Sequence, residues 1–176
     1  MLGKWPCEPP AWPVAPRPFA VEPIGGWLGR VAARYRMSVD ELALQYGLEL
    51  ALDRPGSAWL LVGRIGGPTI ERLARLARVD PESLYAMQGP AGPGQSTHLA
   101  YCPSCLFLNP MDITAPCWRQ EWLCASLNGC AIHAQPWTHL SITSLRKCDN
   151  FDKLLRVISR HERHRRAQRR VATHPR

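Results

Sequence analysis

Four residues with soft metal-ligand side chains occur at spacings that could bind one ion. Cys102 and Cys105 form a C-x2-C pair, and after 24 intervening residues Cys130 and His133 form a C-x2-H pair. Residues at this separation lie about one tight turn apart, so both can reach the same ion. Together the pairs supply three thiolates and one imidazole, a tetrahedral set that suits Zn²⁺. We therefore predict one structural zinc ion at these four residues.

The residues around the two pairs favour a metal site. Pro103 and Ser104 separate the first two cysteines, and the dipeptide Asn128-Gly129 stands directly before Cys130. Asn-Gly is a strong turn dipeptide that favours positive φ, and a zinc knuckle needs a turn on the N-terminal side of its ligands. In the alternative interpretation, the cysteines are ordinary buried thiols and the histidine is a surface imidazole.

The same ligand set argues against catalysis. A catalytic zinc keeps one coordination position open for water, whereas four good ligands close the shell. A zinc deaminase would carry an H-x-E motif before its P-C-x-x-C motif, and no H-x-E precedes Tyr101 and Cys102. A zinc enzyme is therefore the weakest of the functions considered, and we expect the ion to hold the fold together.

The net charge of +8 comes from the C-terminal segment. Residues 1–145 carry 11 Lys and Arg and 11 Asp and Glu, whereas residues 146–176 carry 11 and 3. This local excess predicts non-specific binding to DNA, with a solvated basic tail as the alternative. No aromatic residue follows Phe151, which argues against base stacking. The candidate phosphate-binding residues are Lys153, Arg156, Arg160, Arg163, Arg165, Arg166, Arg169 and Arg170.

The composition is that of a small globular protein. The 176 residues suffice for one domain or two very small ones, and the apolar fraction of 45% permits a core. No apolar run approaches the roughly 18 residues of a membrane span, and the N-terminus lacks the apolar stretch of a signal peptide. With seven cysteines and no export signal, we expect a cytoplasmic protein with reduced thiols. Cys7 and Cys148 are unassigned; Cys117 and Cys124 are expected to be buried, and either could replace a predicted ligand.

Residues 1–22 are predicted to form an extended arm. Seven of the 17 prolines lie within the first 23 residues, interleaved with Trp5 and Trp12. This density of proline excludes a helix or a central strand. We predict that the two tryptophans bind a partner, because tryptophan is enriched among interface hot spots. In the alternative, the arm folds back and covers the chain's own helical domain.

Residues 23–88 are predicted to form a helical domain. Apolar residues at helical spacing predict a first helix from Pro23 to Arg36. A second helix begins at Ser38, where Glu41 completes a capping box, and ends at Gly47. The short turn between them is typical of a helix-turn-helix. Two further helices are predicted to begin at Gly67-Pro68 and at Asp80-Pro81-Glu82.

A linker and a zinc-finger module follow the helical domain. Residues 89–97, GPAGPGQST, have the composition of a linker, and residues 98–145 contain the four predicted ligands. Within this module Trp118 and Trp122 lie four residues apart, on one face of a predicted helix. We expect both tryptophans to be core residues against the zinc site rather than a stacking platform.

The basic segment, residues 146–176, is predicted to contain a helix over residues 151–170. Its short apolar stripe ends at Ile158, and beyond Ser159 nearly all residues are charged, so we expect fraying or disorder there. The sequence thus predicts a mainly α protein with a small zinc-binding module. Its parts are an N-terminal helix-turn-helix-like bundle, a Cys3His zinc finger and a basic C-terminal helix or tail.

Three stretches of the chain resemble the TniQ family, the target-selection proteins of transposons that use heteromeric transposases. Arg17-Pro18 and Glu22-Pro23-Ile24-Gly25-Gly26-Trp27-Leu28-Gly29-Arg30 are similar to the family's R-P opening and its E-S-x-x-S-W-L-x-R helix start. Tyr101-Cys102-Pro103-Ser104-Cys105-Leu106 is similar to R-x-C-P-x-C-L. Trp118-Arg119 with Trp122, followed by Cys130-Ala131-Ile132-His133, is similar to W-R-x-x-W…C-x-x-H. The three motifs in this order are specific, although each alone is weak.

The resemblance implies a non-enzymatic adaptor in DNA transposition. Members of the family link a target-recognition module, such as an RNA-guided complex, to an AAA+ ATPase regulator that recruits the transposase. In size the chain resembles the short TniQ proteins of CRISPR-associated transposons. It departs from the family where Gly26 replaces a serine. It also departs where Phe151, rather than cysteine, follows Cys148 by three positions, so a second zinc finger is degenerate or absent.

The main alternative is a small zinc-containing transcription regulator that uses residues 38–50 as a helix-turn-helix. Base-reading helices usually present Arg, Asn or Gln to the DNA. The predicted helix instead carries Asp40, Glu41 and Glu49 beside Gln45, and these carboxylates would repel phosphates. The residues therefore favour the adaptor.

Overall fold

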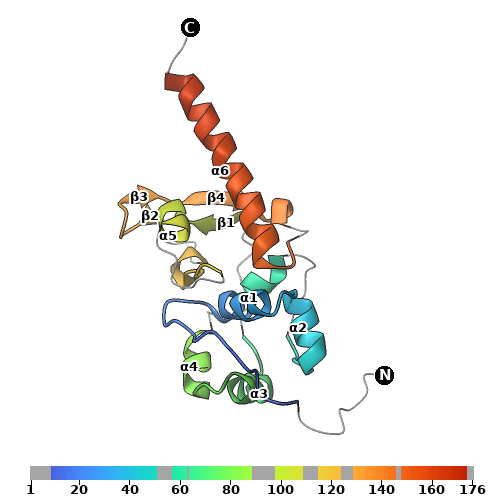
Figure 1. Cartoon of the computed structure of the whole chain (residues 1–176). Helices are drawn as coiled ribbons and strands as arrows, with labels where there is room; N and C mark the ends of the chain where they lie inside the picture. Colours follow the sequence, from blue (N-terminus) through green and yellow to red (C-terminus); the bar gives the residue numbers. More distant parts are fainter. Residues whose placement is uncertain are drawn as a thin grey trace.

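The computed structural model describes residues 9–50, 57–62, 64–88, 98–108, 115–123, 129–145 and 148–173. The chain is mainly helical, as predicted, with two small antiparallel sheets near its C-terminal half (Figure 1). The elements are α1 (Ile24–Arg34), α2 (Val39–Tyr46), η1 (Ser57–Leu61), α3 (Gly67–Ala77), α4 (Pro81–Ala86), β1 (His98–Tyr101), α5 (Pro103–Phe107), η2 (Gln120–Leu123), β2 (Gly129–Cys130), β3 (Gln135–Pro136), β4 (Thr138–Ser141), η3 (Ile142–Leu145) and α6 (Phe151–Thr173).

Local capping signals place the second helix, α2. The Ser38 hydroxyl accepts from the Glu41 N–H at 3.1 Å, and the Glu41 carboxylate accepts from the Ser38 N–H at 2.7 Å. This is the predicted capping box, and the left-handed Gly47, with φ of 57°, ends α2 as predicted. Because each bond satisfies an orphan N–H of the first turn, the start of α2 is fixed by its own sequence. The first helix is slightly shorter than predicted and ends at Arg34.

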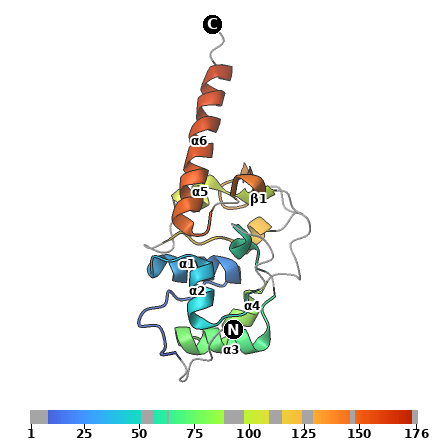
Figure 2. The ribbon, with the colours of Figure 1, turned by 90° about the vertical axis from the view of Figure 1, so that its right-hand side faces the viewer.

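The predicted starts of the third and fourth helices are also confirmed. Pro68 lies in the first turn of α3, where a missing N–H costs nothing. Asp80 caps α4 by accepting from the Glu82 N–H at 3.3 Å. In Figures 1 and 2 these two helices lie at the end of the molecule opposite to α6, with α1 between them and the strands.

The central helix α1 is contacted closely on the side that carries its glycines. A Cβ atom at Gly25 would collide with the backbone oxygen of Trp59 in η1. At Gly29 it would collide with the Trp59 ring and lie 2.7 Å from the ring of Phe151 at the start of α6. Trp59 and Phe151 themselves meet edge to face, with ring centroids 4.9 Å apart. The small residues of α1 therefore let η1 and α6 pack directly against its backbone.

Replacing Gly29 by alanine should destabilise the protein. Alanine in a helix interior normally gains about 0.5–1 kcal/mol over glycine, but here the new methyl group would displace two buried rings. Overpacking of this kind costs about 1–3 kcal/mol, so urea denaturation should show a net loss of unfolding free energy. Gly66→Ala is the matched control, because its Cβ would meet only Pro68 Cδ at 3.9 Å. A stabilising Gly29→Ala would contradict the close packing.

The N-terminal arm is extended and packs against α1 and the residue after it. The indole of Trp12 is 2% exposed and lies between Trp27 and Tyr46, with ring centroids 6.3 Å and 5.5 Å away. The Trp27 indole N–H donates to the Pro16 carbonyl at 2.8 Å, and the Tyr35 hydroxyl donates to the Val14 carbonyl at 2.6 Å. The arm from Trp12 onward thus covers its own helical domain, as in the alternative weighed above.

The sheet of β1 and β4 lies beside the first half of α6, which it meets where Tyr101 contacts Glu162 (Figure 1). The two strands are antiparallel, and β1 also contacts η2. Trp118 and Trp122 are buried and pack edge to face with ring centroids 5.0 Å apart, so both are core residues as predicted. The two tryptophans do not share a helix, however. Trp122 lies in η2, a single short turn, whereas Trp118 precedes that turn. The spacing of four residues predicts one α-helix that carries both tryptophans. The structure instead has irregular chain up to Arg119, followed by the 3₁₀ turn of η2.

The last helix departs most from the sequence expectation. Instead of fraying after Ser159, α6 continues to Thr173. Its buried stripe does not stop at Ile158, because Glu162 is 6% exposed and its carboxylate accepts from the Tyr101 hydroxyl at 2.8 Å. Arginine is also a good helix former. The expectation of disorder was wrong because a polar anchor extends the packed face by one turn.

Some expectations fall outside the described residues. These are the linker at 89–97 and the side chains of Trp5, Cys7 and Cys124. In the part of the chain that the structure does describe, no helix is both long and apolar enough to cross a membrane.

Candidate metal centre and nucleic-acid interface

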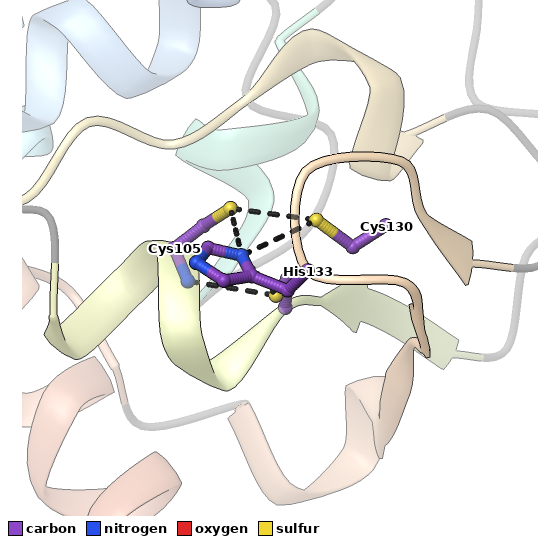
Figure 3. Close-up of side chains that lie close together, drawn as sticks. Cys105, Cys130 and His133 are labelled. Atoms are coloured by element: carbon purple, nitrogen blue, oxygen red, sulfur yellow. Dashed lines mark hydrogen bonds between the residues drawn. The ribbon is translucent and has the colours of Figure 1, made fainter.

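Two short elements bring the four predicted ligands together. Cys102 is the N-cap of α5, where its sulfur accepts from the Cys105 N–H at 3.5 Å, and Pro103 occupies the first turn. Cys130 ends β2, and His133 lies in the turn that joins it to β3. Figure 3 shows the His133 ring between Cys105, which belongs to α5, and Cys130, which ends β2.

The distances among the ligand atoms match the edges of a small tetrahedron. His133 Nδ1 lies 3.5 Å from Cys102 Sγ, 3.3 Å from Cys105 Sγ and 3.5 Å from Cys130 Sγ. Cys105 Sγ and Cys130 Sγ are 3.6 Å apart, and all four atoms lie within 4.8 Å of one another. Zinc bonds of about 2.3 Å to sulfur and 2.0 Å to nitrogen predict edges of about 3.8 Å and 3.5 Å. The predicted ligands therefore form a group that could hold a metal ion.

The second knuckle is a tight hairpin. Gly129 pairs with Pro136 and Cys130 pairs with Gln135, which leaves a four-residue turn containing His133. The residue with positive φ is Ala134, at 45°, whereas Gly129 is part of β2. The expectation of a positive φ at the Asn-Gly dipeptide was therefore wrong at Gly129. A side chain there would instead press on the Gln135 carbonyl at 3.1 Å, which explains the glycine.

Gln135, which the sequence did not single out, is a further polar residue at the cluster. Its amide donates to Cys102 Sγ and to the Ser104 hydroxyl, each at 3.0 Å. At Cys102, burial acts to raise the pKa, but hydrogen bonds led by the Cys105 N–H and Gln135 outweigh it and lower the pKa. At Cys105, burial and the two neighbouring thiols raise the pKa to about 12. A bound cation would favour the thiolate form of all three.

The other described cysteines lie apart from this group. The Cys117 thiol donates to the Trp118 carbonyl at 3.5 Å, and Cys117 is buried as predicted. Cys148 is also buried, which raises its pKa, and its carbonyl accepts from the Trp59 indole N–H at 3.0 Å. Among the described residues, the group of possible ligands contains Cys102, Cys105, Cys130 and His133 and neither of these two.

The predicted phosphate-binding residues all lie on α6, but on different faces. Lys153, Arg156, Arg160, Arg163 and Arg166 are exposed, whereas Arg165 is half-buried with its guanidinium 3.5 Å from the Glu162 carboxylate. Lys153 is paired with Asp149 at 2.7 Å on the surface. Arg169 and Arg170 belong to the helix, but the structure does not describe their side chains. Arg156, Arg160 and Arg163 line one shallow groove with Asp152, Leu155 and Ser159.

Of the two predicted partner-binding residues, only Trp12 is described. Since it is buried in the helical core, its ring is not accessible to a partner in this structure. Its backbone N–H also donates to the Leu76 carbonyl at 2.7 Å, which fixes the arm against α3. Trp5 precedes the described residues.

Sequence reasoning missed a buried ion pair beside the arm. Arg30 on α1 donates from Nε and Nη2 to the two carboxylate oxygens of Glu22, both at 2.7 Å, and both side chains are essentially inaccessible. Nη2 also donates to the Arg17 carbonyl at 2.7 Å, and the guanidinium lies 4.4 Å from the centroid of the Phe19 ring. One signal in the sequence could have indicated the pair. Arg17, Glu22 and Arg30 all belong to the first stretch that resembles the TniQ family.

The chain combines a helical bundle with a Cys3His group that could complete a tetrahedral metal shell. This organisation is typical of binding proteins that a metal ion stabilises. Comparison with protein families sharpens this class, because the family model described as TniQ matches residues 13–136. The chain therefore belongs to the TniQ family, a family of non-catalytic adaptors in DNA transposition. The match includes the arm from Pro13, the helical domain and all four residues of the Cys3His group, and it ends before β4 and α6. A search of curated proteins found no match.

Proposed function

We propose that this protein is a transposition adaptor that links a target-recognition module to an AAA+ ATPase regulator, carries one structural zinc ion and contacts DNA through α6. The observation that carries the proposal is the TniQ match over residues 13–136, which includes the ligand cluster. The target-recognition module in this proposal is an RNA-guided complex or another one. The Cys3His group, the N-terminal arm and α6 each support one part of this proposal: the zinc ion, the ATPase contact and the DNA contact.

The donor set supports zinc as the resident ion. Three sulfurs and one imidazole nitrogen suit Zn²⁺ and disfavour hard cations such as Mg²⁺ and Ca²⁺, which take oxygen ligands. The four residues would hold it as a crosslink between α5 and the hairpin of β2 and β3. They fill the four positions that zinc prefers, so the ion would stabilise the fold rather than activate water.

The arm supports binding of the ATPase through the residues that precede Trp12. Since Trp12 anchors the chain against α3, the segment containing Trp5 starts from a fixed point on the helical domain. A Pro-rich segment also loses little entropy when it binds in an extended form. The proposed contact is therefore Trp5, with Trp12 as its anchor.

Two tryptophan substitutions should separate contact from anchor. Trp5→Ala should weaken binding to the ATPase by about 30-fold, as loss of a hot spot of about 2 kcal/mol does, and should leave the melting temperature unchanged. Trp12→Ala should lower the melting temperature by several degrees, because it empties a core site. Thermal scans and a pull-down with the ATPase measure both effects. Full ATPase affinity in Trp5→Ala would contradict the assignment of Trp5.

Exposed arginines on α6 should set the salt dependence of DNA binding. Each phosphate neutralised adds about 0.9 to the slope of log affinity against log salt. Arg156→Gln together with Arg160→Gln should therefore lower that slope by about 2 and weaken binding equally for unrelated sequences. Arg34→Gln with Arg64→Gln is the matched control, since both arginines are exposed and lie outside α6. Equal losses in the two pairs would exclude α6 as the DNA-binding element.

The adaptor role itself is tested by reconstitution. The purified chain should be retained by the AAA+ ATPase of its transposon only when that ATPase is assembled on DNA, and the complex should recruit the transposase. Failure of the chain to associate with the DNA-bound ATPase, under conditions where the ATPase recruits the transposase, would overturn the proposal.

A further inference from the structure

The helix α6 consists of a packed half and a projecting half. In the first half, Phe151, Leu154, Ile158 and Glu162 are buried at spacings of three and four residues. After Glu162 no described side chain of the helix is buried: Arg165 is half-buried, and Arg163, His164, Arg166, Ala167 and Gln168 are exposed. Both views show this second half extending away from the body (Figures 1 and 2).

The packed half fixes the direction in which the rest points. At one end of the packed half the Phe151 ring meets Trp59, and at the other the Glu162 carboxylate accepts from Tyr101, which directly precedes Cys102. Arg165 pairs with the same carboxylate at 3.5 Å, one turn further along. Because these contacts lie about 16 Å apart along the axis, the helix cannot pivot without breaking one of them.

The projecting half is strongly cationic from Arg163 to Arg170. Residues 163–173 contain five arginines and no acidic residue. The helix C-terminus carries a partial negative charge, so a phosphate at its tip would be repelled, whereas Arg163 and Arg166 are exposed along its sides. This arrangement fits a polyanion that lies alongside the helix.

We infer that the projecting half of α6 inserts into the major groove of duplex DNA, which rests on the DNA contact proposed above. An α-helix with side chains is about 10–12 Å across and the major groove is about 12 Å wide and 8.5 Å deep. The 11 residues from Arg163 to Thr173 span about 16 Å. A helix of that length can enter the groove and run along the edges of several base pairs. Its arginines would then contact the phosphates on either side of the groove.

Other nucleic acids fit the helix less well. The major groove of duplex RNA is deep and narrow, and the minor groove of DNA is about 6 Å wide, so neither admits a helix. Single strands are held largely by stacking on large aromatic rings, and residues 152–176 contain no Phe, Tyr or Trp. Duplex B-form DNA is therefore the ligand that the shape and composition favour.

Ala167 marks the face that would enter the groove. By helical periodicity it lies opposite the stripe of Phe151, Ile158 and Glu162, on the same side as Arg160 and Arg163. A small exposed residue there lets the helix backbone approach the base edges, and a methyl group can contact the methyl of thymine. This makes position 167 a probe that carries no charge.

Three substitutions at Ala167 test insertion without changing the charge of the full-length protein. Ala167→Phe adds bulk on the inserting face, Ala167→Pro breaks the projecting helix, and Ala167→Ser is the small control. Affinity for a short DNA duplex should fall by about tenfold or more in the first two, as loss of a good base-edge contact does, and should be kept in the third. Circular dichroism and the melting temperature verify that the body remains folded.

Chemical probing locates the groove directly. Dimethyl sulfate methylates guanine N7 in the major groove and adenine N3 in the minor groove. Saturating protein should protect guanine N7 and leave adenine N3 reactive. Duplex RNA of the same sequence should bind more weakly than the DNA.

The outcomes separate insertion from the DNA contact on which it rests. Salt-sensitive duplex binding that all three variants keep, with guanine N7 unprotected, would overturn insertion and leave α6 as a backbone-binding element. Protection of adenine N3 instead would also overturn it. Absence of duplex binding, or tighter binding to duplex RNA, would overturn insertion and the DNA contact together.

Discussion

Replacing Cys105 by serine should release the metal ion and unfold the module that α5 and the hairpin form. Structural zinc contributes about 10–16 kcal/mol of apparent binding free energy in small zinc domains at neutral pH, which is as large as the whole stability of a typical domain. Cys105 lies within 3.6 Å of Cys130 Sγ and 3.3 Å of His133 Nδ1, so its loss removes one corner of the tetrahedron. Elemental analysis should show about one zinc per chain in the parent protein and almost none in the variant.

The damage should extend beyond the ligands. Tyr101 precedes the first ligand and holds Glu162, so loss of the module should also release the anchor of α6. Limited proteolysis should therefore cut α6 in Cys105→Ser and not in the parent. Cys117→Ser is the matched control, because this cysteine is equally buried, lies outside the cluster, and serine can keep its bond to the Trp118 carbonyl. A chelated protein with an unchanged melting temperature would show that the ion is not structural.

Removal of one partner of the buried ion pair should have the second-largest effect. Arg30→Met would leave the Glu22 carboxylate buried without its bidentate partner and would open the bond to the Arg17 carbonyl. Breaking a buried pair in this way costs about 3–5 kcal/mol, which urea denaturation would register as a large shift in midpoint. The double variant Glu22→Leu/Arg30→Met should recover much of the loss, because two apolar residues of similar size leave no charge behind.

A surface pair of the same length provides the control. Arg119 and Glu121 also lie 2.7 Å apart, but their side chains are 21% and 33% exposed. Arg119→Met should cost about 0–1 kcal/mol, since water replaces the lost contact. A double variant of Glu22 and Arg30 that is no more stable than Arg30→Met would show that the pair acts through packing rather than through an unpaired charge.

The features predicted from the sequence are those set by neighbouring residues. The box of Ser38 and Glu41, the stop at Gly47 and the cap at Asp80 each depend on atoms within a few residues, so local sequence suffices. The ligand cluster was also predictable, because two short pairs need only one common ion to define their geometry.

The features that were missed depend on which distant surfaces meet. Nothing near Glu22 or Arg30 indicates that an arm will cover them, and charged residues are normally exposed. Glu162 looked like part of a solvated run because its partner, Tyr101, lies 61 residues earlier. The arm illustrates the same limit: both fates of Trp12 were compatible with its sequence, and the position of α3 decides between them.

The bond from the Trp59 indole to the Cys148 carbonyl sets an order of events during synthesis. The two residues are 89 positions apart, and Phe151, which covers the same indole, comes later still. At about 5–20 residues per second, the ribosome needs roughly 5–20 s to supply the second partner. Until then the helical half exposes a tryptophan and the glycine face of α1. During this interval the first half of the nascent chain has been synthesised, but its core still lacks Cys148 and Phe151. A chaperone that holds unfolded chains would act during this interval.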